Sequence, residues 1–134
     1  MIAAIRKLAN HGVFNVPRAL QRAALNALVT GDAFLAATRA AYQAARDLTL
    51  AKLTVPTAVP KGGGYVFVDL SAHVAPGEAS ALGVLEQLAA QGILLAPGEA
   101  FGRAYAKHAR LCYTAVPEAQ LSAGLDRLAE ALAR

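Results

Sequence analysis

One arginine, Arg110, stands within the short apolar run ARLCYT. If this run is a β-strand, its side chains alternate between two faces, so Arg110 shares a face with Cys112 while Leu111 and Tyr113 point the other way. A guanidinium in this position has two interpretations. It is a solvated edge arginine, or it is a planar fork that binds a carboxylate through two parallel hydrogen bonds. Spacing alone leaves both open.

The other residue types that often do chemistry are scattered. The histidines lie in separate predicted elements with no cysteine pair nearby, so no metal site is expected from His11, His73 and His108. No Ser-His-Asp arrangement can be argued from spacing. Cys112, which stands between two large apolar residues, is typical of a small buried residue rather than a nucleophile. We therefore assign no catalytic residue.

The glycine run KGGG at residues 61 to 64 precedes a predicted strand. A phosphate-binding loop lies instead between a strand and the N-terminus of a helix, so the run is a weak phosphate signal. A plain turn explains the glycines as well as a close approach of the backbone to a neighbouring segment or a ligand.

Composition limits the classes of protein. The 134 residues suit one domain with a real core. The net charge is +4, but the basic residues are scattered without interleaved aromatic residues, so nucleic acid is not an expected partner. A single cysteine excludes an internal disulfide, and MIAAIRKLAN is a poor signal peptide, so we expect a cytoplasmic location. No run approaches the roughly 18 apolar residues of a membrane span, so no membrane partner is expected.

The first third of the chain predicts helices. Residues 1 to 9 are typical of the end of a helix, which Gly12 interrupts. A second helix should begin at Pro17 and end near Thr30, with Gly31 in a left-handed closing conformation. Asp32 would then cap the longest helix, which continues to about residue 53.

The residues after position 53 predict short strands and two further helices. The run YVFVDL, residues 65 to 70, is short and rich in β-branched and aromatic residues, which indicates a strand buried on both faces. A helix over 79–91, a brief strand at ILL, the loop APGEAFG, a last strand over 109–114 and a helix from Pro117 follow. The sequence therefore predicts an α+β fold, an α/β sandwich in which a sheet of about three strands is covered by helices and preceded by a long helix.

Four blocks of the sequence resemble, in order, the C-terminal part of fold-type I, class I/II aminotransferases. They are IRKLANHGVFNVPRALQRAALNAL, PKGGGYVFVDLS, LLAPGEAFG and ARLCYTAVPEAQLSAGLDRL. The likeness spans nearly the whole chain and is most similar to kynurenine, glutamine and methionine aminotransferases. It implies amino group transfer between an amino acid and a 2-oxo acid with pyridoxal phosphate as cofactor.

The resemblance also implies roles for particular residues. The strand arginine of the family binds the substrate α-carboxylate, and its match is Arg110. An aromatic and a following polar residue enter the neighbouring subunit's substrate pocket, and the matches are Phe14 and Asn15. Relatives often carry histidine or serine at the position of Asn15, which leaves the preferred substrate side chain open. Tyr65 lies where the family's strand enters near the substrate side chain.

The family's cofactor lysine has no match in this sequence, nor have the aspartate and arginine that hold the cofactor. Four lysines match no part of the lysine motif: Lys7, Lys52, Lys61 and Lys107. The resemblance thus implies a C-terminal third, with residues 1–30 as a remnant of the large-domain and interface segment and 31–134 as the small domain. We expect the chain alone to be inactive and to bind no pyridoxal phosphate covalently.

The apolar residues among the first 30 positions would be exposed to solvent unless another surface buries them. We expect a homo-oligomer, or a chain that carries the aminotransferase large domain, to bury Val13, Phe14, Val16, Leu20, Leu25 and Leu28. Two alternatives stay open. One is a free-standing non-catalytic module, either an oligomeric remnant or a binder of small carboxylates through Arg110, and the other is an unrelated α+β amino-acid sensor.

Overall fold

The computed structural model describes residues 1–133. Its helices follow the helical spacing of leucine and alanine, and its strands follow short β-branched runs bounded by glycine and proline. The chain forms two compact units, Met1–Arg39 and Ala40–Arg134. Each unit is considered by itself. The roles predicted for residues 1–30 and 31–134 remain predictions.

The first unit contains α1 (Ile2–Gly12), α2 (Arg18–Thr30) and the start of α3 (Asp32–Lys52). Gly12 is the last residue of α1, so this helix is longer than predicted. The left-handed conformation expected at Gly31 is wrong, because its φ is −81°. A side chain at this position would collide with the carbonyl oxygen of Ala27, so lack of space explains the glycine.

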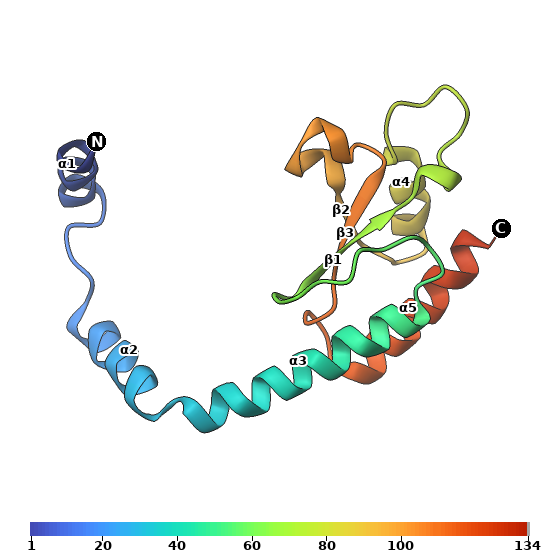
Figure 1. Cartoon of the computed structure of the whole chain (residues 1–134). Helices are drawn as coiled ribbons and strands as arrows, with labels where there is room; N and C mark the ends of the chain where they lie inside the picture. Colours follow the sequence, from blue (N-terminus) through green and yellow to red (C-terminus); the bar gives the residue numbers. More distant parts are fainter. Residues whose placement is uncertain (134) are drawn as a thin grey trace. The chain divides into compact units, whose positions relative to one another are not determined.

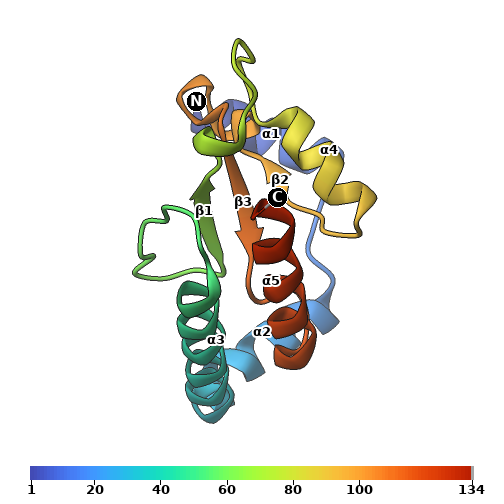
Figure 2. The same cartoon turned by 90° about the vertical axis from the view of Figure 1, so that its right-hand side faces the viewer.

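The second unit is built on an antiparallel sheet with the strand order β1-β3-β2, which Figure 2 shows side by side. The strands are β1 (Tyr65–Asp69), β2 (Ala96–Pro97) and β3 (His108–Cys112). The prediction that β1 is buried on both faces is wrong. Val66 and Val68 are buried, whereas Tyr65 is exposed and Phe67 is half-buried, because the helices cover one face only.

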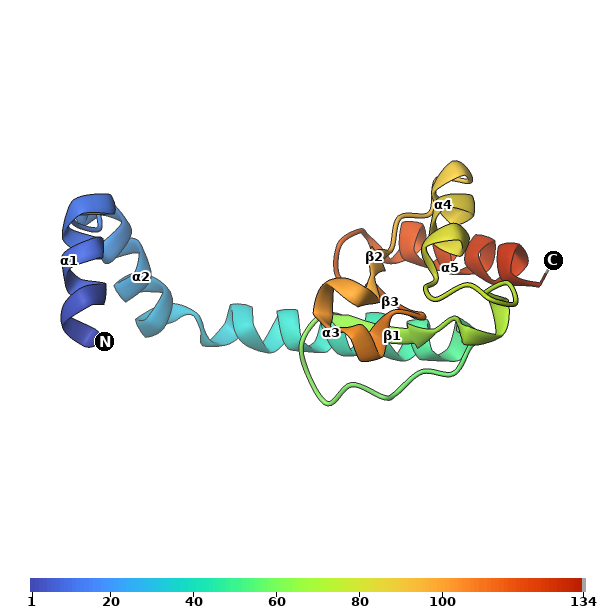
Figure 3. The same cartoon turned by 90° about the horizontal axis from the view of Figure 1, so that it is seen from above.

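The core lies between that covered face and the helices. Buried residues of α4 (Leu82–Ala90) and α5 (Glu118–Leu132) pack against the inward side chains of the strands. Figures 1 and 3 show α4 and α5 on the same side of the sheet. The C-terminal part of α3 adds the fully buried Thr49, whose hydroxyl donates to the Ala45 carbonyl at 2.7 Å. The core residues are Val66, Val68, Leu70, Leu85, Leu88, Ile93, Ala109, Leu111, Tyr113, Leu121, Leu125 and Leu128, with Val55 and Ala81.

Several element boundaries differ from the prediction. The brief strand expected at ILL begins later, at Ala96, because the Ile93 N–H still donates to the Leu88 carbonyl after the helix and Gly92 turns the chain with φ +76°. The expected loop APGEAFG contains β2 and a 3-10 helix, η2 (Gly98–Phe101). The last strand starts at His108, one residue earlier than predicted, and α4 starts at Leu82 rather than at residue 79.

The glycine run before β1 is both a turn and a close approach of the backbone to a neighbouring segment, which are the two interpretations that the sequence left open. Gly63 adopts φ +82°, which favours glycine, and its carbonyl accepts a 2.7 Å hydrogen bond from the buried Tyr113 hydroxyl. A Cβ at Gly64 would lie 2.6 Å from Thr114 Oγ1. The run is therefore a turn that also fits closely against the end of β3.

The observed architecture confirms the predicted α+β fold, with helices on a small antiparallel sheet of three strands in the described residues. Within residues 1–133, no helix combines the length and the apolar character that crossing a membrane requires.

Candidate functional site

Arg110 lies at the middle of β3, the central strand of the sheet. Its cross-strand partners are Phe67 on β1 and Ala96 on β2. Strand alternation buries its neighbours Ala109 and Leu111 on the core side and places Arg110 on the face that the helices leave open. The fold therefore fixes the arginine at the centre of an open sheet face.

Two aromatic rings enclose the Arg110 guanidinium. Its Cζ lies 4.4 Å from the centroid of Tyr65 and 4.8 Å from that of Phe101. These are cation–π distances, and they restrict how the flat group can rotate. The guanidinium is thus held by its surroundings rather than free in solvent.

No acidic partner neutralises this charge within the described residues. The salt bridges among residues 1–133 are Arg46–Asp47 and Lys52–Asp126, and neither involves Arg110. Its Nε is buried, and within the described part of the chain it has no hydrogen-bond partner. A half-buried, preorganised and uncompensated guanidinium is suited to an external anion, above all a planar carboxylate.

An aromatic row continues from the arginine along the open face. Phe67 contacts Phe101 edge to face at 5.3 Å and Tyr105 at 5.4 Å between ring centroids. Tyr105 in turn meets the ring of His108 at 5.7 Å. The segment after β2 folds back over the sheet because Gly98 lets the backbone pass the carbonyl oxygens of Tyr105 and His108, where any side chain would collide.

Asp69 and His108 face each other at one end of the β1–β3 pair. Hydrogen bonds from the side chain and backbone of Ser71, with a smaller contribution from His108, hold the pKa of Asp69 below its ordinary value of 3.8. The Ser71 N–H donates to the carboxylate at 2.9 Å. The Asp69 carboxylate is therefore held by hydrogen bonds from the turn that follows β1.

The predicted site residues fall into the two units. Tyr65 and Arg110 are brought together in the second unit, as described above. Phe14 and Asn15 belong to the first unit, where Phe14 is 86% exposed and has φ +60°. The Asn15 N–H donates to the Val13 carbonyl at 2.7 Å, which closes a tight γ-turn around Phe14. A bulky residue with positive φ is uncommon and marks a strained turn.

Sequence reasoning missed most of the aromatic surroundings of Arg110. The unpredicted members are Phe67, Phe101, Tyr105 and His108. Alternation along β1 could have placed Phe67 on the face of Tyr65. Phe101 comes from the segment APGEAFG, which was predicted to be a loop, and Tyr105 from a segment to which the sequence assigned no element. The contact of Phe101 with Arg110 and that of Tyr105 with Phe67 follow only from how the chain folds back.

The described residues hold no cluster of possible metal ligands, and the open face of β1 and β3 carries no lysine. Residues 1–133 contain no group of three histidine, cysteine or acidic side chains that could hold a metal ion. The side chains of β1 and β3 that share the open face with Arg110 include no lysine: Tyr65, Phe67, Asp69, His108 and Cys112. Lys52 is paired with Asp126 at 2.6 Å. Among the side chains of β1 and β3 on the open face, Arg110 thus offers a guanidinium and none offers a primary amine.

Known proteins that resemble the chain include aminotransferases. No protein-family model matches it. LL-diaminopimelate aminotransferase of Oleidesulfovibrio alaskensis is 32% identical over 132 residues, which cover 96% of this chain and 33% of that protein. The structure of aspartate aminotransferase of Thermus thermophilus with maleate matches with a TM-score of 0.81 and 31% identity, over 97% of this chain and 34% of that one.

A third match is kynurenine aminotransferase of Pyrococcus horikoshii, with a TM-score of 0.59 and 31% identity over 71% of this chain and 24% of that chain. Together these likenesses to aminotransferases are consistent with the C-terminal part of a fold-type I aminotransferase. The chain spans about a third of the length of the curated relatives that it matches.

Proposed function

We propose that this chain supplies the substrate-carboxylate-binding domain of a pyridoxal-phosphate-dependent aminotransferase, with Arg110 as the residue that binds the carboxylate. The observation that carries the proposal is the arginine's setting. Its guanidinium lies between Tyr65 and Phe101 on an open sheet face and pairs with no acidic residue of the described chain.

The proposed role follows from the shape of the guanidinium. Its planar fork offers parallel N–H donors that match the two oxygens of a carboxylate. An amino acid and a 2-oxo acid carry the same α-carboxylate, so one arginine can orient both substrates of a transamination. Because the two rings restrict the plane of the guanidinium, they also restrict the plane of the bound carboxylate.

The cofactor of this proposal is inferred from the aminotransferase relatives and not from the residues around Arg110. When it is bound, pyridoxal phosphate accepts the amino group of one substrate and passes it to the other. We assign no step of that chemistry to this chain, because the face around Arg110 offers no lysine. Segments that correspond to the remaining length of the relatives would hold the cofactor, and this chain alone would be inactive.

Phe14 and Asn15 are proposed to contact substrate in a neighbouring subunit. The support is the exposed Phe14 ring, presented by a turn of positive φ. Large apolar side chains of α1 and α2 are exposed as well, and within the described residues neither helix has a buried side chain. We propose that a second subunit, or a chain with the aminotransferase large domain, covers Ile2, Ile5, Leu8, Leu20, Leu25 and Leu28.

A second candidate is a non-catalytic module that binds small carboxylates. The observation in its favour is that Arg110, Tyr65 and Phe101 all lie within one unit. Both candidates predict carboxylate binding. They differ in whether a partner that carries the cofactor lysine restores amine transfer.

The first experiment is a titration of the ¹⁵N-labelled chain with maleate, followed by NMR of the Arg110 side-chain N–H signals. We expect these signals to shift on binding. Arg110→Gln should weaken binding by about ten- to a hundredfold, because a hydrogen bond to a charged group contributes roughly 1.5–3 kcal/mol. Arg103→Gln removes one positive charge from a neighbouring 3-10 helix and serves as the matched control.

The proposal fails if maleate shifts no Arg110 signal, or if Arg103→Gln weakens binding as much as Arg110→Gln does. A parallel absorbance titration with pyridoxal phosphate tests the expected lack of a covalent link. A shifted band that survives desalting would show that a lysine of this chain forms an imine and would overturn that part of the proposal.

A further inference from the structure

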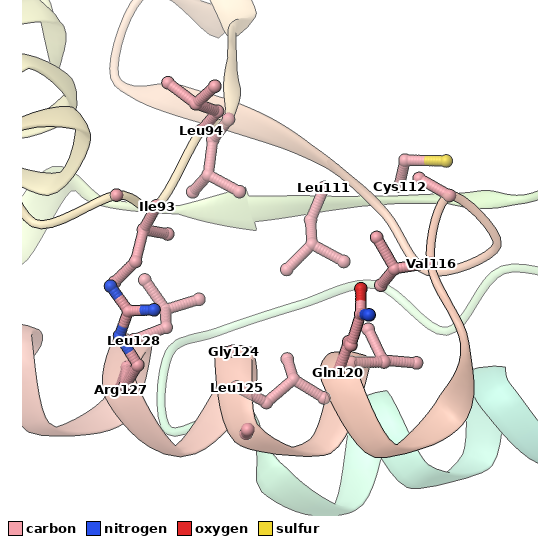
Figure 4. A pocket seen from close by; sticks show the side chains of 15 residues that line it. Ile93, Leu94, Leu111, Cys112, Val116, Gln120, Gly124, Leu125, Arg127 and Leu128 are labelled. Atoms are coloured by element: carbon pink, nitrogen blue, oxygen red, sulfur yellow. The ribbon is translucent and has the colours of Figure 1, made fainter.

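Tyr113 follows the arginine strand β3 and has no role so far in the proposed carboxylate site. Its side chain is 2% exposed and belongs to the core under the helices. Side chains along β3 alternate between the two faces, and Figure 4 shows Leu111 directed toward α5 and Cys112 directed away from it. Tyr113 is therefore buried on the covered side and cannot contact a ligand that binds to Arg110 on the open face.

Tyr113 binds the glycine run before β1 at two points. Its N–H donates to the Gly64 carbonyl at 3.0 Å, and its hydroxyl donates to the Gly63 carbonyl at 2.7 Å. The first bond continues the main-chain pairing of β1 with β3, since the next pair in the register is Tyr65 with Cys112. The second bond comes from the side chain, so a phenylalanine at this position would keep the first bond and lose the second.

The conformation of Gly63 depends on this hydroxyl. Gly63 has φ +82°, and a Cβ built there would meet nothing within 4 Å among the described residues. Glycine adopts positive and negative φ about equally well, and the free space around Gly63 leaves several backbone conformations open to it. The hydrogen bond from Tyr113 selects one of them.

The Gly63 turn leads directly to one of the two rings at the arginine. Tyr65 stands two residues after Gly63, and its ring centroid lies 4.4 Å from Cζ of Arg110. The Tyr65 side chain is 49% exposed, so packing within the described residues holds it only in part. The position of the ring therefore depends on where its own backbone enters β1.

We infer that Tyr113 is a positioning residue of the carboxylate site: its hydroxyl fixes the Gly63 turn, and that turn places the Tyr65 ring on the Arg110 guanidinium. The inference rests on the proposed function and adds a residue that does not touch the substrate. Because the ring restricts the plane of the guanidinium, a hydroxyl on the covered side of the sheet affects how a carboxylate is oriented on the open side.

The test is a double-mutant cycle on the whole chain, with maleate as the probe. Tyr113→Phe keeps the buried ring and should weaken maleate binding by about two- to fivefold, and by no more than Tyr65→Leu does. When Tyr65→Leu is already present, Tyr113→Phe should weaken binding no further, because the ring that the hydroxyl positions is gone. Isothermal titration calorimetry measures the four affinities.

A second readout needs no ligand. The Arg110 Nε is buried, so its N–H should exchange slowly with water and give an NMR signal in the ¹⁵N-labelled chain. A proton near the face of an aromatic ring is shifted upfield. Tyr113→Phe should therefore move this signal downfield, toward its position in Tyr65→Leu. A tyrosine that only stabilises the fold would leave the signal in place.

Three further variants separate the turn from general stability. Gly63→Ala strains the same turn at φ +82° and should reproduce both effects of Tyr113→Phe. Gly62→Ala adds the same methyl group one residue earlier, where a Cβ would meet nothing within 4 Å among the described residues, and should change neither readout. Leu88→Val removes a methylene from the core in α4 and should lower stability while both readouts stay unchanged.

The outcomes decide the inference. It is overturned if Tyr113→Phe leaves both the maleate affinity and the Arg110 signal unchanged, or weakens binding equally with and without the Tyr65 ring. It is also overturned if Leu88→Val reproduces both effects, since lost stability would then explain them. If the parent chain binds no maleate, the proposed function fails, and the Arg110 signal without ligand still decides whether Tyr113 positions the ring.

Discussion

The guanidinium carbon of Arg110 lies 4.4 Å from the ring centroid of Tyr65 on the neighbouring strand β1. The register makes Tyr65 the partner of Cys112, two residues beyond the arginine, so the ring reaches diagonally across the strand pair. Phe101 supplies a second ring at 4.8 Å. The arginine is thereby held in place before any ligand arrives.

The aromatic rings should therefore contribute to carboxylate binding through the arginine. Tyr65→Leu and Phe101→Leu are each expected to weaken maleate binding by about two- to fivefold, since an exposed cation–π contact contributes roughly 0.5–1 kcal/mol. Tyr65→Phe keeps the ring and should bind like the parent chain. Isothermal titration calorimetry measures the affinities, and an unchanged affinity in both leucine variants would contradict a positioning role.

Gly98 should be intolerant of any side chain. Gly98→Ala would force a methyl group against the carbonyl oxygens of Tyr105 and His108, with an expected loss of about 2–3 kcal/mol in the free energy of unfolding. Gly62→Ala is the matched control, because a Cβ there would meet nothing within 4 Å among the described residues. Urea unfolding compares the two variants, and equal stability would show that the segment after β2 adjusts freely.

The Tyr113 hydroxyl should stabilise the turn before β1. Tyr113 is 2% exposed and donates to the Gly63 carbonyl at 2.7 Å. Tyr113→Phe leaves that carbonyl without this donor and should lower the free energy of unfolding by about 1–2 kcal/mol. Tyr42→Phe removes a hydroxyl from a more exposed ring and should change little. Chemical denaturation followed by circular dichroism tests both.

Asp69 should make stability fall at low pH. Its pKa in the folded chain lies below 3.8, chiefly because the Ser71 side chain and backbone N–H bind the carboxylate. A depressed folded pKa contributes stability above the unfolded value, and that contribution disappears as pH falls through the folded pKa. Ser71→Ala should bring the Asp69 pKa, measured by NMR of its carboxyl carbon, closer to 3.8. A larger depression in Ser71→Ala would refute this account.

The sequence by itself determined most of the element types and the resemblance to aminotransferases. The leucine stripe of α5, the β-branched run of β1 and the apolar run around Arg110 are local patterns, and local patterns report secondary structure. The motif blocks also placed the carboxylate-binding candidate at Arg110. The start of β2 was misplaced because a hydrogen bond from Ile93 to Leu88 prolongs the helix ending, which no apolar pattern records.

Only the tertiary structure decided which face of the sheet is covered and what surrounds the arginine. The side-chain alternation of β1 did not reveal that one side stays open, since that depends on the docking of α4 and α5. Phe101 reaches Arg110 because Gly98 permits a backbone approach between segments. Such contacts join residues that are close in space but separated in the sequence, so a local sequence pattern does not predict them.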